Sequence, residues 1–194
     1  MNNIFVFLFM LTVPLLGHCK PIFLGDSLTY QLATSYKNIA PVDAQYLVGS
    51  GLSNNQKLDW IEYIKTVDIQ KYDTVYIVLG TNDFIQTNEI SGYMYKASIF
   101  IKEIKKKNNN IVWLIPPTLQ DSSKNELLQN TRAAIYKAST QEKIKILDMR
   151  ESLGMRYEKV IDGVQIRTDD GIHITRKGAD YIIAQINNSK FIEY

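Results

Sequence analysis

One serine of this chain directly follows a short apolar run. Ser27 lies in the stretch PIFLGDSLTY, where the run ends on glycine and aspartate. A serine hydroxyl is a poor nucleophile until a base removes its proton, and the usual base near neutral pH is histidine. Of the two histidines, His18 lies in an apolar N-terminal segment, which leaves His173. Asp170 precedes His173 by three residues, close enough for its carboxylate to orient the imidazole ring.

Ser27 also has a purely structural interpretation. A helix is expected to begin at this point, and serine is a favoured residue at a helix N-terminus. A hydroxyl in that place also lies beside unpaired backbone N–H groups, which can stabilise a developing oxyanion. Asp26 is either a turn carboxylate or a contributor to the same loop. The sequence leaves both interpretations open.

The elements that must position these residues alternate along the chain. Strands are expected over residues 21–24, 43–48, 74–79, 110–115 and 143–147, and helices over 27–36, 55–65, 92–107, 122–140 and 175–187. This alternation predicts a mainly parallel sheet with helices on both faces. The unbroken apolar runs TVYIVL and IVWLI are typical of strands buried on both sides. We therefore expect a single α/β domain.

Composition agrees with one domain and excludes some classes of function. The chain has 194 residues, of which 45% are hydrophobic, enough for one substantial core. Its formal net charge of +2 is too small to indicate a nucleic-acid surface. Cys19 is the one cysteine, so neither an intrachain disulfide nor a cysteine-based metal site can form.

Two loops are expected to face each other across the sheet. Open parallel sheets bind ligands beyond the carboxyl ends of their strands, where the strand order reverses. In a five-stranded sheet of order 2-1-3-4-5, the first and third strands flank that point. These strands end in Gly-Asp-Ser (residues 25–27) and Gly-Thr-Asn-Asp (residues 80–83). The amide of Asn82 would then lie opposite Ser27 and could stabilise a tetrahedral intermediate, although asparagine is also an ordinary turn residue.

These motifs together resemble the SGNH/GDSL hydrolase superfamily, over nearly the whole chain after the N-terminal segment. Four blocks occur in the family's order: GDSL (residues 25–28), a glycine block (49–52), GTND (80–83) and DGIH (170–173). The resemblance implies a three-layer α/β/α sandwich, flavodoxin-like, with a five-stranded parallel sheet in the order 2-1-3-4-5. It also implies that no metal or cofactor is needed.

Block by block, the resemblance implies roles for individual residues. Ser27 would be the nucleophile, His173 the base and Asp170 its orienting carboxylate. The oxyanion hole would consist of the Ser27 N–H, the Asn82 side chain and a glycine N–H. Gly51 is favoured for the glycine, with Gly49 as the alternative.

A narrower likeness concerns a bacterial cell-envelope group within the superfamily, some of whose members remove or transfer O-acetyl groups on peptidoglycan or exopolysaccharide. It rests on three motifs: Gly51-Leu52 followed by Asp59-Trp60, Val112-Trp113 leading to Pro116-Pro117, and RTDDGIHIT (residues 167–175). Trp60 and Trp113 either pack in the core or stack on sugar, and Arg167 either lines the mouth of the site or pairs with a carboxylate. Asp26, Asp83 and Arg167 are further candidates for contact with the substrate.

The N-terminal segment suggests export. Residues 4–16 (IFVFLFMLTVPLL) are short for a membrane span and fit the core of a signal peptide. We expect a signal peptide over residues 1–19, either cleaved or retained as an anchor, and a hydrolase domain over residues 20–194. The protein would then be periplasmic or secreted.

The expected function is a serine esterase for short O-acyl esters, acetyl above all, on an envelope polysaccharide or peptidoglycan. Two alternatives use the same sequence features. An O-acyltransferase would pass the acyl group to a sugar hydroxyl through the same residues. A protein that binds polysaccharide without turnover would keep only the fold.

Overall fold

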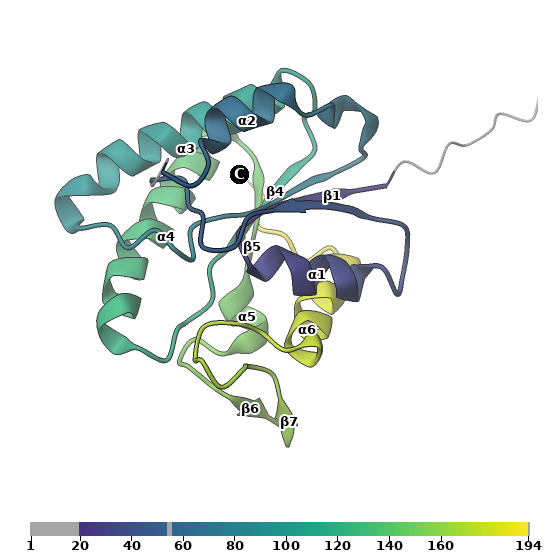
Figure 1. The fold of residues 1–194 in the computed structure, drawn as a ribbon, viewed down its shortest axis with the longest axis vertical. Helices are drawn as coiled ribbons and strands as arrows, with labels where there is room; N and C mark the ends of the chain where they lie inside the picture. Colours follow the sequence, from purple (N-terminus) through teal and green to yellow (C-terminus); the bar gives the residue numbers. More distant parts are fainter. Residues whose placement is uncertain (1–19, 54–55, 194) are drawn as a thin grey trace, which may run out of the picture.

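The computed structural model describes residues 20–53 and 56–193. A five-stranded parallel sheet in the order β2-β1-β3-β4-β5 forms its centre (Figure 1), as the sequence predicts. The strands are β1 (Ile22–Gly25), β2 (Asp43–Tyr46), β3 (Val75–Val78), β4 (Ile111–Ile115) and β5 (Lys145–Asp148). The signal peptide expected over residues 1–19 lies outside the described residues.

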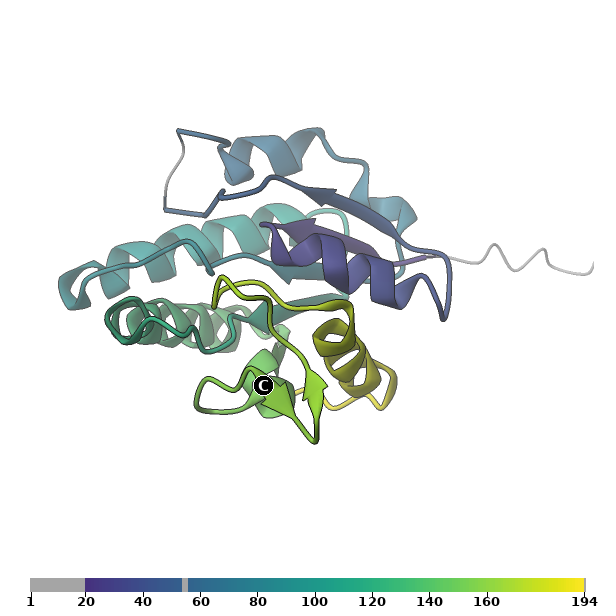
Figure 2. The same ribbon diagram turned by 60° about the horizontal axis from the view of Figure 1, so that its bottom comes forward.

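Helices cover both faces of the sheet (Figures 1 and 2). Helices α2 (Trp60–Thr66), α3 (Ile90–Lys105) and α4 (Ser122–Glu142) pack on one face, and α1 (Leu28–Tyr36), α5 (Met149–Leu153) and α6 (Arg176–Asn187) pack on the other. Alternate strand residues supply the two cores because successive side chains of a strand point to opposite faces. On β4, for example, Trp113 packs in the α2/α3/α4 core, and Val112 and Leu114 pack in the other. The three-layer α/β/α expectation is thereby confirmed.

Some element boundaries differ from the prediction. Helix α2 begins at Trp60, five residues later than expected, because the Asp59 side chain accepts hydrogen bonds from the Ile61 and Glu62 N–H groups and caps the helix there. Helix α4 extends to Glu142 and ends at Lys143, which has a left-handed backbone (φ 51°). Helix α5, the β6–β7 hairpin and two 3₁₀ turns were not predicted. Their bounds are Val160–Ile161 (β6), Val164–Gln165 (β7), Ile69–Lys71 (η1) and Thr87–Glu89 (η2).

Both tryptophans belong to the core and are not available to a sugar. Trp60 and Trp113 are fully buried, which agrees with the packing interpretation and excludes the stacking one. Their indole N–H groups also hold loops at the carboxyl edge of the sheet. Trp60 donates to the Ser50 hydroxyl (3.1 Å), and Trp113 donates to the Leu79 carbonyl (3.0 Å).

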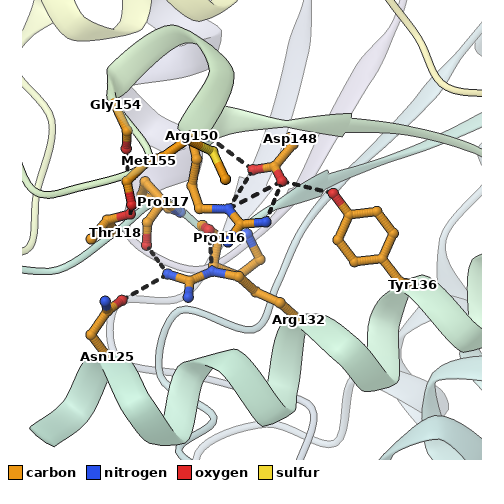
Figure 3. A network of polar contacts seen from close by, with 10 residues as sticks. All are labelled: Pro116, Pro117, Thr118, Asn125, Arg132, Tyr136, Asp148, Arg150, Gly154 and Met155. Atoms are coloured by element: carbon orange, nitrogen blue, oxygen red, sulfur yellow. Dashed lines mark hydrogen bonds and ion pairs between the residues drawn. The ribbon is translucent and has the colours of Figure 1, made fainter. Parts of the chain in front are cut away.

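A buried arginine fixes the loop that follows β4 (Figure 3). Arg132 of α4 donates to the carbonyls of Pro116 (2.8 Å) and Pro117 (2.6 Å) and to the side chain of Asn125 (3.0 Å). Burial lowers the pKa of Arg132 to about 10, and the nearby positive charge of Arg150 acts in the same direction. This guanidinium supplies donors to the carbonyls of the two prolines, which lie beyond the last paired residue of β4.

A short ion pair lies beside Arg132 in the same view (Figure 3). Arg150 donates to Asp148 at 2.6 Å, and the Tyr136 hydroxyl donates to the same carboxylate at 2.7 Å. The loop after β4 is further tied to the end of α5, because the Thr118 hydroxyl donates to the Met155 carbonyl (3.0 Å). Polar contacts thus join strand β4, helix α4 and helix α5 at the carboxyl edge of the sheet.

Replacement of Arg132 by lysine tests this bracing. Lysine cannot present a planar fork to two carbonyls, so Arg132→Lys is expected to lower the free energy of unfolding by about 1–3 kcal/mol. The measurement is urea unfolding followed by circular dichroism. The matched control is Arg156→Lys at an exposed position, for which we expect a change within about 0.5 kcal/mol. Equal effects of the two substitutions would contradict a bracing role for Arg132.

Candidate active site

Ser27 lies between β1 and α1, where the chain turns from the sheet into the helix. Asp26, and not Ser27, caps the helix, because Asp26 Oδ1 accepts the Leu28 N–H at 3.0 Å and the Ser27 side chain makes no capping bond. The Ser27 hydroxyl instead lies 2.8 Å from Nε2 of His173. The purely structural interpretation of Ser27 therefore does not describe its side chain.

His173 and Asp170 lie in a tight loop between β7 and α6. Nδ1 of His173 is 2.6 Å from Oδ2 of Asp170. The other carboxylate oxygen, Oδ1, accepts the Ile172 N–H (2.8 Å), the His173 N–H (2.9 Å) and the Thr168 hydroxyl (2.7 Å). Because one oxygen fixes the loop, the other is held toward the imidazole ring.

The environment of Asp170 favours its charged form. Partial desolvation raises its pKa, but the hydrogen bonds from the His173 side chain and from the Ile172 and His173 backbone outweigh it and hold the pKa well below its usual range. The carboxylate is therefore ionised at any pH at which the protein is expected to work. An ionised partner at Nδ1 places the proton of a neutral imidazole on that nitrogen and leaves Nε2 free to accept one from Ser27.

Arg167 contacts the histidine loop from the interior of the protein. Its guanidinium is buried, donates to the Ile172 carbonyl at 2.7 Å and lies over the ring of Tyr157. Burial lowers its pKa, and the same burial separates the guanidinium from ligands in solvent. The expectation that Arg167 contacts the substrate is not supported, and neither is pairing with a carboxylate. Its contact with Ile172 makes it a positioning residue for His173.

The loop after β4 supports the histidine loop on its other side. The Gln120 N–H donates to the Gly171 carbonyl at 3.0 Å. Gly171 has a left-handed backbone (φ 71°), and a Cβ at this position would lie 2.6 Å from Cβ of Gln120. Only glycine fits here, which explains the residue between Asp170 and His173 in the DGIH block. The Arg132 network thus supports the histidine loop indirectly.

The glycine block is held by Asp83. This buried carboxylate accepts the Leu52 N–H (2.8 Å), the Ser53 N–H (3.0 Å), the Ser53 hydroxyl (2.6 Å) and the Tyr93 hydroxyl (2.8 Å). A Cβ on Gly51 would lie 2.1 Å from Oδ1 of Asp83, so the loop can approach the carboxylate only with glycine at that position. Asp83 is fully enclosed, and the expectation that it contacts substrate is not supported.

Several N–H groups near Ser27 are candidates for an oxyanion hole. Within the described part of the chain, the backbone N–H groups of Ser27, Gly49 and Gly51 donate to no protein acceptor. Asn82 donates one amide hydrogen to the Ser50 carbonyl at 2.8 Å, which leaves the second free. Ser50 C=O and Gly51 N–H belong to one trans peptide and point in opposite directions. The Gly51 N–H therefore points away from Asn82 in this conformation, and hydrogen bonding does not decide between Gly49 and Gly51.

Asp26 is the second buried carboxylate of this region. Burial raises its pKa to about 7, and the charge of Asp83 adds to the effect, while the Leu28 N–H and Thr81 oppose it. Its Oδ2 makes no hydrogen bond to any described residue. Asp26 is fully enclosed, so the expectation of a substrate contact is not supported for it either.

A hollow of about 270 Å³ opens beside the serine and histidine. Ser27, His173 and Thr168 line one part, and Tyr30, Tyr46 and Val48 line another. The two tyrosines were not foreseen, although signals were present. Tyr30 follows Ser27 by about one helical turn, and Tyr46, the last residue of β2, lies within the strand predicted over residues 43–48 that leads into the glycine block. Residues 20–53 and 56–193 contain no cluster of His, Cys, Asp and Glu that could hold a metal ion.

Comparison with known proteins agrees with this fold. A family profile described as "Protein of unknown function (DUF459)" matches residues 20–189. No curated protein matches the sequence significantly. Solved structures of SGNH/GDSL-type proteins match with low identity but over most of the chain, which shows the shared fold.

Three of these structures illustrate the range of proteins that share the fold. A lipase/acylhydrolase from Enterococcus faecalis is 14% identical (TM-score 0.64) over 91% of this chain and 99% of its own. A carbohydrate esterase family 3 protein from Talaromyces cellulolyticus is 17% identical (TM-score 0.64) over 89% and 96%. A peptidoglycan O-acetylesterase is 16% identical (TM-score 0.60) over 77% of this chain and 45% of its own.

The raised pKa of Asp26 predicts a pH-dependent stability. Its unfolded-state pKa is near the ordinary 3.8 and its folded-state pKa is about 7, so the folded protein binds the extra proton between these values. The contribution of Asp26 to stability is thus fully present below about pH 4 and is lost as the pH rises through 7. Asp26→Asn keeps the acceptor for Leu28 and removes the charge.

Asp26→Asn is therefore expected to unfold at higher urea concentration than the parent at pH 8.5, with a difference that shrinks or reverses at pH 5. Urea unfolding at both pH values measures this. The control is Asp162→Asn, at an exposed position in the turn between β6 and β7. A difference between the Asp26 variant and the parent that does not change with pH would refute the raised pKa.

Proposed function

The chain belongs to the DUF459 family and has the fold of the SGNH/GDSL hydrolases, and from this premise we propose that it is a serine esterase. Its substrates would be short O-acyl esters, acetyl above all, on a polysaccharide or peptidoglycan of the cell envelope. The observation that carries the proposal is the continuous chain of contacts from the Ser27 hydroxyl to His173 (2.8 Å) and from His173 to Asp170 (2.6 Å).

The first half-reaction forms an ester on the serine. Nε2 of His173 takes the proton of Ser27 as Oγ attacks the carbonyl carbon of the substrate. The imidazolium that forms is stabilised by Asp170, whose depressed pKa keeps it ionised and unable to take the proton itself. As the tetrahedral intermediate collapses, His173 passes its proton to the leaving alcohol. The acyl group stays on Ser27.

The second half-reaction uses the same groups on water. His173 takes a proton from a water molecule that attacks the acyl carbonyl, and the proton then returns to Oγ of Ser27 as the acid leaves. The side chains of His173 and Asp170 are 38% and 47% exposed. Such exposure gives water ready access to the acyl-enzyme, which favours hydrolysis over the acyltransferase alternative.

The negative oxygen of each intermediate needs donors. We assign the Ser27 N–H and the free amide hydrogen of Asn82 to this role, with a glycine N–H as the third donor. Gly51 can serve beside Asn82 if the peptide between Ser50 and Gly51 rotates, and a residue without Cβ permits such backbone rotation. Gly49 is the alternative donor.

The glycan part of the proposal draws on two of the structural neighbours, a carbohydrate esterase and a peptidoglycan O-acetylesterase. Export, proposed from the apolar residues 4–16, would bring the protein to such substrates. In the described part of the chain no helix is both long and apolar enough to cross a membrane. The polysaccharide-binding alternative offers no reason for an assembled Ser27–His173–Asp170 chain.

Replacement of the proposed nucleophile tests the reaction class. The parent is expected to hydrolyse p-nitrophenyl acetate, and Ser27→Ala is expected to lose covalent turnover because the hydroxyl that lies beside His173 Nε2 is removed. Release of p-nitrophenol measured by absorbance gives both rates, with Ser122→Ala on exposed residue 122 as the matched control. Activity of Ser27→Ala near that of the parent would rule out the mechanism.

Asn82→Ala tests the oxyanion hole. Loss of one such donor typically lowers kcat by about 100- to 1,000-fold, so this variant should be weak but measurable. Asn110→Ala, at an exposed position before β4 and thus at the opposite edge of the sheet, is the control and should keep kcat within about twofold. A kcat of Asn82→Ala equal to that of the control would remove Asn82 from the site.

A further inference from the structure

Exposed apolar side chains gather beside the proposed nucleophile. Tyr30 (51% exposed), Tyr46 (42%) and Val48 (58%) all line the hollow that contains Ser27 and His173. Neighbouring Leu47 is exposed as well. Exposed apolar patches of this kind commonly mark binding sites, and this one adjoins groups that could do chemistry.

The two tyrosines come from different elements and form a pair. Tyr30 lies on α1 and Tyr46 at the end of β2, with ring centroids 5.9 Å apart and planes inclined at 49°. They do not stack flat on each other, and each ring remains about half exposed. A tyrosine ring offers an apolar face together with a polar hydroxyl, so this pair suits a ligand that is itself amphipathic.

The position of His173 decides which half of an ester this hollow receives. In the proposed cycle His173 protonates the leaving alcohol, so the alcohol oxygen must lie within hydrogen-bond reach of Nε2. His173, Thr168 and Ile174 line the same hollow as the tyrosines. An alcohol that leaves next to His173 would therefore extend toward Tyr30 and Tyr46.

We propose that Tyr30 and Tyr46 form the subsite for the alcohol half of the substrate, and that this alcohol is a neutral sugar ring. The inference rests on the proposed esterase function and adds the residues that would select its substrate. A sugar ring presents C–H groups on its faces and hydroxyls at its edge, which matches apolar rings bordered by polar groups.

The polar lining of the hollow agrees with a neutral ligand. Gln31 lies on the rim, and its amide makes no hydrogen bond to another described residue, so it can bind sugar hydroxyls. No Asp, Glu, Lys or Arg occurs among the described residues that line this hollow. A charged headgroup would find no partner there. An acyl chain would be misplaced, since the acyl half lies away from the leaving oxygen that His173 protonates.

Two acetyl esters that differ only in the alcohol test the proposal: methyl 6-O-acetyl-β-glucopyranoside and ethyl acetate. Tyr30→Ala and Tyr46→Ala are each expected to lower kcat/KM for the glucoside by about 3- to 10-fold, because each removes one aromatic contact. Both should lower kcat/KM for ethyl acetate less than for the glucoside, because an ethyl group is too small to cover the aromatic rings. Tyr30→Phe and Tyr46→Phe keep the rings and lose only the hydroxyls, so their kcat/KM for the glucoside should lie between that of the parent and that of the alanine variants.

Tyr95→Ala is the matched control, since Tyr95 is exposed on α3 and does not line this hollow. Equal losses on both esters would overturn the subsite, because the tyrosines would then only shape the catalytic loops. No loss on either ester would overturn it as well. If the parent hydrolyses neither ester, it is the esterase function that fails.

Binding without turnover then tests the subsite separately. Saturation-transfer NMR with cellotriose is expected to show contact with the parent and with Ser27→Ala, and weaker contact with the Tyr30→Ala/Tyr46→Ala double variant. Absence of contact with the parent, or equal contact with the double variant, would overturn the sugar subsite whatever the reaction proves to be.

Discussion

The site depends on the hydrogen bonds that the buried carboxylate of Asp83 accepts. Asp83 receives hydrogen bonds from the loop at residues 52–53 and from Tyr93 of α3, and the Thr131 hydroxyl of α4 donates to its backbone carbonyl. The loop at residues 52–53, helix α3 and helix α4 are thereby all joined to Asp83, the neighbour of Asn82 in the chain. A carboxylate can remain in such a dry place only when donors satisfy it. At Asp26, whose Oδ2 has no hydrogen-bond partner among the described residues, burial raises the pKa to about 7.

The histidine side of the site is held by a second series of contacts that begins far from the reaction. Arg132 fixes the two prolines after β4, the same loop reaches Gln120, and Gln120 binds Gly171 (Figure 3 shows the first of these steps). Arg167 holds Ile172 from the core side. Asp170 and His173 are thus placed by backbone contacts on both sides. Asp170 and His173 are partly exposed, and they need such support because side-chain motion would otherwise change the distance and angle between them.

The β–α alternation predicted the parallel sheet with helices on both faces. The strand order, and with it the residues that meet at the sheet edge, came from the resemblance to the SGNH/GDSL superfamily that the short motifs at strand ends carry. Ser27, Asp170 and His173 lie together as expected. Substrate contact was expected for Asp26, Asp83 and Arg167 because charged residues next to a motif suggest it, but here these side chains are enclosed and bind backbone groups. Burial of a charge depends on the whole fold and cannot be read from its neighbours in sequence. The same holds for α5 and the β6–β7 hairpin, which are too short to show a period.

Labelling of the nucleophile tests the central claim most directly. An alkyl fluorophosphonate reacts with serine hydroxyls that a neighbouring base activates, and peptide mass spectrometry locates the adduct. One adduct is expected, on Ser27, in the parent and none in His173→Ala, because the hydroxyl loses its base in that variant. An adduct on another residue, or equal labelling of Ser27 without His173, would contradict the central claim.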